Sequence, residues 1–175
     1  DTVKGLAVLC RNNGNSIDYK GFPQNLIKPI PIVAIPSTTG TGSEVVSSAS
    51  IIDEETKIKL GINYHDNYPV LAILDPLVAS SAPFSVLASS GCDALVHALE
   101  SFVSKKSNHV TRIFSKRAFV LIMENMPILL NNNGNEQNWS NLQWAAIFAI
   151  TALTNTSSGP TGALSYYLGV NFKVP

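Results

Sequence analysis

The hydrophobic pattern of the chain changes near residue 78, from short apolar runs to a helical repeat. Before that point, apolar runs end at Pro, Gly or charged residues, at 31–35, 50–52, 57–62 and 70–74. Runs of this length and composition are typical of β-strands. After it, apolar residues recur with the 3.6-residue period of an α-helix. The sequence therefore predicts an α/β part over residues 1–78 and an all-helical part over 79–175.

The expected strands are of two kinds. The runs at 31–35 and 70–74 are continuously apolar, as central parallel strands buried on both faces are. The runs at 50–52 and 57–62 flank a charged segment, Asp53–Thr56, and alternate polar and apolar residues, which predicts a hairpin. A short helix is expected before them, within residues 2–10.

The second part predicts helices separated by polar or proline-containing segments. Ser90 has the features of an N-cap with Asp93 three residues later, so we expect a helix to begin there. Its apolar side is expected to carry Leu95, Leu99, Phe102 and Val103. Further helices are expected over 110–125, 142–153 and 162–168, with Pro127 beyond the end of the first and an exposed loop over 130–138.

Composition excludes several partners and settings. The 12 basic and 12 acidic residues cancel and form no basic cluster, so we expect no binding to nucleic acid or to a membrane surface. No apolar run approaches the roughly 20 residues that span a bilayer. Cys10 and Cys92 are far apart and no signal peptide is found, which favours a reduced, cytoplasmic setting over a disulfide scaffold.

A segment rich in Ser, Thr and Gly, Pro36–Glu44, directly follows the first expected strand. Its glycines allow backbone N–H groups to approach an anion, and its hydroxyls suit a pyrophosphate or a ribose. It lacks the Lys of a Walker A loop and the third glycine of the dinucleotide fingerprint. From these residues alone, a cofactor loop and an ordinary turn both remain open.

Asp93 and His97 are spaced four residues apart, which places a carboxylate and an imidazole on one face of a helix. That pair can bind a divalent metal, but two ligands do not complete a site. His65 and His109 lie in expected loops without ligand-like neighbours. A solvated helix face, with Asp93 as a capping acid, is the alternative.

Four motifs occur in the order in which they stand in one known family: 35–45, 53–60, 72–76 and 91–101. With them, the chain resembles the iron-containing (group III) alcohol dehydrogenase family over essentially its whole length. Its start resembles the helix after the family's Gly-Gly-Gly-Ser loop, and its end resembles the segment before the family's Pro-His-Gly motif. The resemblance implies a Rossmann-like NAD(P)-binding part and an all-helical metal-binding part, the dehydroquinate synthase-like architecture. We expect the chain to be a fragment of that fold.

The resemblance also implies residue roles at the cofactor. Thr38 and Thr41 match the loop that contacts the pyrophosphate and nicotinamide ribose of NAD or NADP. Lys59 and Leu74 match further cofactor contacts.

Asp93 and His97 match the first two ligands of the family's iron or zinc. Gly162 stands where the family has its third ligand, a histidine, so the resemblance carries over only half of the metal site. Tyr166 stands where the family has a histidine in the cleft, and we expect its hydroxyl to polarise a carbonyl or pass a proton. A packed tyrosine is the alternative.

These residues predict an NAD(P)-dependent oxidoreductase that interconverts a small alcohol and its aldehyde or ketone, metal-assisted in the family and acting as a homo-oligomer. Two alternatives stay open. One is a degenerate or truncated relative without activity, and the other is a lyase similar to dehydroquinate synthase.

Overall fold

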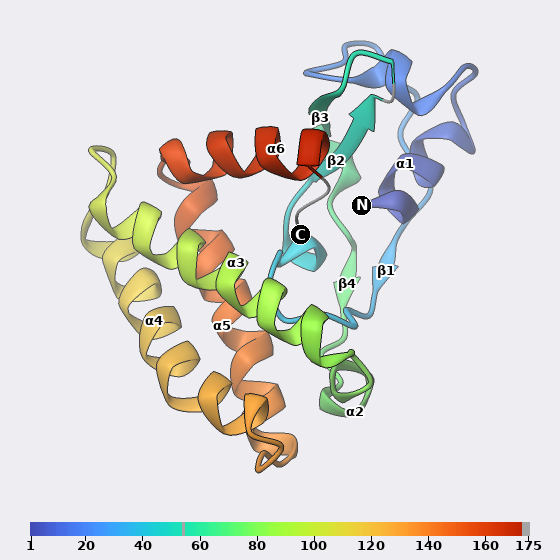
Figure 1. Ribbon diagram of the computed structural model, residues 1–175. Helices are drawn as coiled ribbons and strands as arrows, with labels where there is room; N and C mark the ends of the chain where they lie inside the picture. Colours follow the sequence, from blue (N-terminus) through green and yellow to red (C-terminus); the bar gives the residue numbers. More distant parts are fainter. Residues whose placement is uncertain (54, 173–175) are drawn as a thin grey trace. The chain divides into compact units, whose positions relative to one another are not determined.

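The computed structural model describes residues 1–53 and 55–172 (Figure 1). Contacts divide the chain into two compact units. The sheet unit contains residues 1–34, 43–72 and the described residues after 162, and the helical unit contains 35–42 and 73–162. Segment 35–42 therefore belongs with the helices, although strands precede and follow it in the sequence. This division does not test the expected domain boundary at residue 78, which stays a prediction.

The sheet unit contains two pairs of strands. β1 (Val33–Ala34) pairs in parallel with β4 (Leu71–Ala72), as the two apolar runs predict. β2 (Ser48–Asp53) pairs in antiparallel register with β3 (Ile58–Asn63), which confirms the hairpin. Its connection includes residue 54, which lies outside the described residues.

The expected burial of the parallel strands is wrong for the described chain. Val33 is 54% exposed and Leu71 is 51% exposed. Each strand contributes only two residues to the pair, which is too few to form a layer with two covered faces. The continuous apolar run therefore predicted the pairing of these strands but not their surroundings.

Helix α1 (Thr2–Leu9) confirms the expected opening helix, and three single turns of 3₁₀ helix follow: η1 (Ser16–Tyr19), η2 (Ser43–Val45) and η3 (His65–Asn67). Contacts of α1 with β2, η1 and η3 enclose a small core. Val8, Ala49 and Ile62 are completely buried there. The hairpin and α1 thus stabilise each other by burying apolar surface.

The helical unit is built on three long helices, α3 (Phe84–Val103), α4 (His109–Leu130) and α5 (Glu136–Thr154), which pack on one another (Figure 1). The short α2 (Pro76–Ser80) packs on α5, and α6 (Pro160–Phe172) begins in this unit. The core consists of aliphatic residues and alanines: Leu87, Ala94, Leu121, Ile122, Met126, Leu129, Leu142, Ala145 and Ala146.

Helix α3 corrects two expectations. It begins at Phe84, after Pro83, so Ser90 is an interior residue and not an N-cap. Gly91 faces Met126 of α4, where a Cβ would lie 2.7 Å from the sulfur, so this glycine permits close helix packing and does not mark a helix start. The expected apolar side is largely exposed, and the buried side consists mainly of small residues: Leu87, Gly91, Ala94, Ala98 and Ser101. Small side chains let α4 and α5 approach α3 closely, which explains the difference.

The other helices are longer than expected. Helix α4 continues through Pro127, which lies inside the helix, and ends at Leu130. Helix α5 begins at Glu136 with Asn135 as its cap, which shortens the expected loop. Buried Asn125 of α4 accepts hydrogen bonds from Asn138 and Asn141 at 2.9 and 3.0 Å, and these bonds fix the start of α5 on α4.

Among the described residues, α3 is long and apolar enough, by length and composition alone, to cross a bilayer. The expectation that no apolar segment has this length is therefore wrong. In this structure α3 packs against α4 and α5 through its face of small residues, as a core helix does in a helical bundle.

Candidate active site

The loop after β1 holds two glycines in direct contact with helices. A Cβ on Gly40 would lie 2.3 Å from the carbonyl oxygen of Ser90 on α3, and a Cβ on Gly42 would lie 2.4 Å from Cγ2 of Ile150 on α5. Gly42 also has a φ of +59°, which residues with a side chain rarely adopt. Both positions require glycine because the loop backbone runs against α3 and α5.

The three threonines of this loop differ in exposure. Thr41 is exposed and Thr38 is half-buried, so both predicted cofactor contacts are accessible to solvent. Thr39 is 1% exposed, and its hydroxyl has no hydrogen-bond partner within the described residues. The loop is irregular up to Gly42, as expected, and turns into η2 at Ser43.

Lys4 of α1 holds the backbone that follows this loop. Its buried ammonium donates hydrogen bonds to the carbonyl oxygens of Ser43, Val46 and Ser48 at 2.6, 2.7 and 2.9 Å. Burial lowers the pKa of Lys4 to about 8, and the negative charge of Glu44 acts in the opposite direction. Burial raises the pKa of Glu44 as well. This role was not predicted, because a single Lys on a short amphipathic helix is usually a surface residue.

Asp93 and His97 lie on one face of α3, as their spacing predicts. Nε2 of His97 is 3.5 Å from Oδ1 of Asp93. The imidazole is largely buried, and its Nδ1 has no hydrogen-bond partner in the part of the chain that the structure describes. A carboxylate and an imidazole that face each other are donors that divalent metals accept.

The residues present do not complete a metal site. Within residues 1–53 and 55–172, no three His, Cys, Asp or Glu side chains are grouped closely enough to hold a metal. Gly162 has no side chain that could bind a metal, and a Cβ there would meet no atom within 4 Å. Among the described residues, the Nδ1 of His97 also has no acceptor of the kind that usually orients a metal-bound histidine. Asp93 and His97 alone therefore do not form a closed metal site.

In the sheet unit, the structure brings together two of the predicted site residues. The Lys59 ammonium of β3 lies 4.2 Å from the centroid of the Tyr166 ring of α6, in a cation–π contact. Tyr166 is 46% exposed, so it is not a packed core tyrosine in the described chain.

Leu74 belongs to the helical unit and is half-buried; in the sequence it follows β4 and precedes α2. The next residue, Asp75, caps α2 by accepting a hydrogen bond from the backbone N–H of Leu77 at 2.8 Å. The side-chain amide of Gln143 on α5 donates to the Asp75 carbonyl at 3.2 Å. Leu74 therefore precedes a backbone segment that is fixed from two sides.

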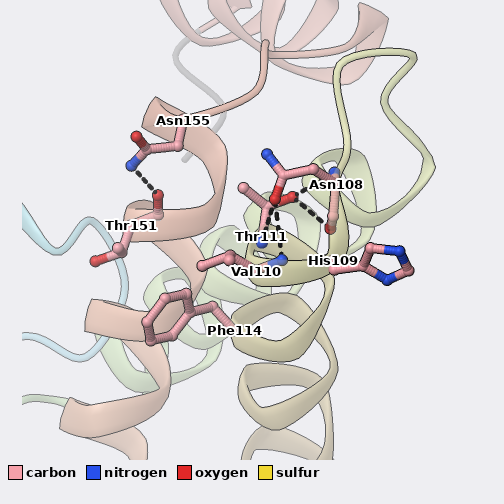
Figure 2. Close-up of a pocket in the computed structure, with 7 residues that line it drawn as sticks. All are labelled: Asn108, His109, Val110, Thr111, Phe114, Thr151 and Asn155. Carbon is pink, nitrogen blue, oxygen red and sulfur yellow. Dashed lines mark hydrogen bonds between the residues drawn. The ribbon is translucent and has the colours of Figure 1, made fainter.

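A cavity of about 490 Å³ lies in the helical unit between the start of α4 and the end of α5 (Figure 2). Its polar groups bond to each other: Asn108 accepts the N–H groups of Val110 and Thr111, and Asn155 donates to the Thr151 carbonyl. His109 points away from Phe114 in Figure 2. None of the predicted site residues lines this cavity.

Two family profiles match the chain in succession. The profile described as iron-containing alcohol dehydrogenase matches residues 1–76. The profile described as the C-terminal part of the Fe-containing alcohol dehydrogenase family matches residues 87–175. The chain belongs to the iron-containing alcohol dehydrogenase family. The resemblance drawn from the four motifs is thereby confirmed.

Curated members of the iron-containing alcohol dehydrogenase family match the chain from end to end. The 1,3-propanediol dehydrogenase of Klebsiella pneumoniae is 34% identical over 176 residues, which cover 100% of this chain and 45% of that protein. The NAD-dependent methanol dehydrogenase of Bacillus methanolicus is 33% identical over 99% of this chain and 46% of its own length.

The crystal structure of a 1,3-propanediol oxidoreductase superposes with a TM-score of 0.89 at 32% identity, covering 98% of this chain and 45% of that one. The match confirms the predicted fold class, an α/β part followed by an all-helical part. The chain thus spans less than half the length of the relatives that it matches.

Proposed function

We propose that the protein is an NAD(P)-dependent oxidoreductase that interconverts a small alcohol and its aldehyde or ketone. The observation that carries this proposal is the match to two profiles of one dehydrogenase family, at residues 1–76 and 87–175. The printed names of its relatives, a 1,3-propanediol dehydrogenase and an NAD-dependent methanol dehydrogenase, support a small alcohol as the substrate.

The loop at 36–44 is the proposed binding site for the cofactor pyrophosphate. Gly40 and Gly42 press its backbone against α3 and α5, while Thr38 and Thr41 remain accessible. A loop fixed in this way presents N–H and hydroxyl groups without an ordering cost at the moment of binding. Lys59 and Leu74 are proposed as further cofactor contacts.

Alcohol oxidation transfers a hydride from the carbinol carbon to the nicotinamide and releases the hydroxyl proton. We assign the proton exchange to the Tyr166 hydroxyl. The contact of its ring with Lys59, with 4.2 Å between the ammonium and the ring centroid, supports this role because it places Tyr166 beside a residue proposed to contact the cofactor. Asp93 and His97 are proposed as two side chains that would hold a metal. Neither takes part in the proton exchange proposed for Tyr166.

One observation favours a second candidate, a family member without dehydrogenase activity. Position 162 carries glycine, and the described residues contain no three grouped metal-type side chains. If turnover in this protein depends on a metal, the lack of a metal-binding side chain at position 162 abolishes turnover.

The experiment is an assay of the full-length protein with NAD+ or NADP+ and a series of short alcohols and diols, read by the absorbance of the reduced nicotinamide. The proposal expects reduction that depends on the alcohol, with and without prior treatment with a chelator. Thr41→Val is expected to weaken cofactor binding, and Thr2→Val, at another exposed threonine, is the matched control. A protein that binds neither cofactor and reduces neither contradicts the proposal and supports the inactive relative.

A further inference from the structure

Glu100 of α3 is a buried carboxylate that binds the segment where α6 begins. It is 8% exposed. Its Oε2 accepts a hydrogen bond from the backbone N–H of Gly159 at 2.8 Å, and its Oε1 accepts one from the backbone N–H of Thr161 at 2.9 Å. The first N–H groups of a helix have no partner within the helix and attract negative charge. Glu100 therefore satisfies this helix end from a neighbouring helix.

The approach of the two segments is close. A Cβ on Gly159 would lie 2.7 Å from Oε1 of Glu100, so a side chain at this position would displace the carboxylate. Burial alone raises the pKa of Glu100, but hydrogen bonds from the N–H of Gly159, from the hydroxyl and N–H of Thr161 and from the N–H of Gly162 outweigh burial and lower it. The carboxylate is thus ionised while it holds the start of α6.

Glu100 shares a helical face with the metal-type pair. It follows His97 by three residues on α3, and His97 follows Asp93 by four. The residue after Thr161 is Gly162, where an added side chain would meet open space. One helix therefore carries both the Asp93–His97 pair and the group that holds the backbone at position 162.

We propose that Glu100 is a positioning residue: it holds the first turn of α6 on α3 and so sets where residue 162 lies relative to Asp93 and His97. The chain keeps this support although it lacks a donor at position 162. A histidine placed there reaches the pair only while Glu100 is present. The inference rests on the proposed function only for its consequence in catalysis, and its test needs no turnover.

The test uses Co²⁺, whose visible absorption reports the number and type of its ligands. Full-length Gly162→His is expected to bind Co²⁺ at least about tenfold more tightly than the natural protein, with a change in the visible spectrum. Asp93→Ala in the Gly162→His background should remove the gain, which locates the metal. Glu100→Gln in the same background should also remove it, because the amide replaces one acceptor oxygen with a donor that faces an N–H group.

Two further variants separate positioning from general damage. Glu124→Gln changes an exposed glutamate of α4 and should keep the gain. Thr161→Pro removes both the N–H and the hydroxyl that Thr161 directs at Glu100 and leaves Glu100 itself intact, in the first turn of a helix where proline is tolerated. In the Gly162→His background this variant should lose the tighter Co²⁺ binding, as Glu100→Gln does. Its far-ultraviolet circular dichroism should remain that of the folded protein.

The proposal is overturned if folded Gly162→His binds Co²⁺ no more tightly than the natural protein does. It is also overturned if the tighter binding persists with both Glu100→Gln and Thr161→Pro. The spectra are recorded without cofactor or alcohol. A failure of alcohol oxidation therefore leaves this outcome unchanged, and a failure here leaves the proposed function standing.

Discussion

The Lys59 ammonium lies 4.2 Å from the centroid of the Tyr166 ring, so a residue predicted to bind the cofactor touches the residue predicted to be catalytic. The two come from a strand and a helix that are far apart in the sequence. The contact places the Tyr166 ring beside β3 within the sheet unit.

Tyr166→Phe tests the hydroxyl and keeps the ring beside Lys59. We expect cofactor affinity to be unchanged and kcat to fall by about 10²–10⁴, the usual contribution of a positioned acid or base. Steady-state kinetics with varied cofactor and alcohol measure both effects. The control is Tyr167→Phe, at the exposed neighbour on α6. Equal activity of the two variants would contradict a catalytic Tyr166.

Lys4→Met should destabilise the protein. The variant leaves the buried or partly buried carbonyl oxygens of Ser43, Val46 and Ser48 without their donor. Unsatisfied buried groups cost about 1–3 kcal/mol, so the free energy of unfolding should fall by at least that amount. Urea titration measures it. Lys28→Met, at an exposed lysine, is the matched control and should change stability little.

Gly40→Ala should displace the proposed cofactor loop. Its Cβ would lie 2.3 Å from the Ser90 carbonyl oxygen, and a helix backbone cannot move aside cheaply. We expect a loss of about 1–3 kcal/mol in stability, as for other overpacked sites, and weaker cofactor binding. Gly61→Ala is the control, because its nearest contacts would lie at an ordinary 3.5 Å. Similar behaviour of both variants would show that the loop is not pressed against α3.

Glu100 should make part of the stability depend on pH. Its pKa in the folded protein lies below the ordinary value of 4.5, so the folded state binds fewer protons than the unfolded state in that range. The stabilisation is complete above pH 4.5 and is lost as the pH falls through the folded pKa. Free energies of unfolding, measured from neutral pH into this acid range, should fall less steeply for Glu100→Gln. Parallel curves for the two proteins would contradict this assignment.

The elements that rest on local patterns were predictable. Alternation on both sides of Asp53 predicted the β2–β3 hairpin, and the apolar runs at 31–35 and 70–74 predicted the parallel pairing. The order of the motifs predicted the family. The spacing of Asp93 and His97 predicted their shared face, which their 3.5 Å approach confirms. Their role as ligands stays a prediction, as do the roles of the cofactor residues.

The features that depend on long-range contact were not predictable. The buried face of α3 contains Ala98 and Ser101, which a hydropathy pattern ranks below the exposed Leu99 and Phe102. Packing distance between helices selects those small residues, and the pattern does not contain that distance. Lys4 finds its carbonyl partners about forty residues along the chain, and Glu100 finds Gly159 nearly sixty residues along. Nothing local to either residue indicates its partner.

The assignment of segment 35–42 to the helical unit has a consequence for recombining relatives of this protein. A chimera joined near residue 78 takes Gly40 and Gly42 from one parent and Ser90 and Ile150 from the other. An added methyl group at Gly40 or Gly42 would clash with these helices. Both sides of each contact should therefore come from the same parent. A crossover that transfers 35–42 together with 73–162 respects the physical boundary, although it divides the sequence in four places instead of one.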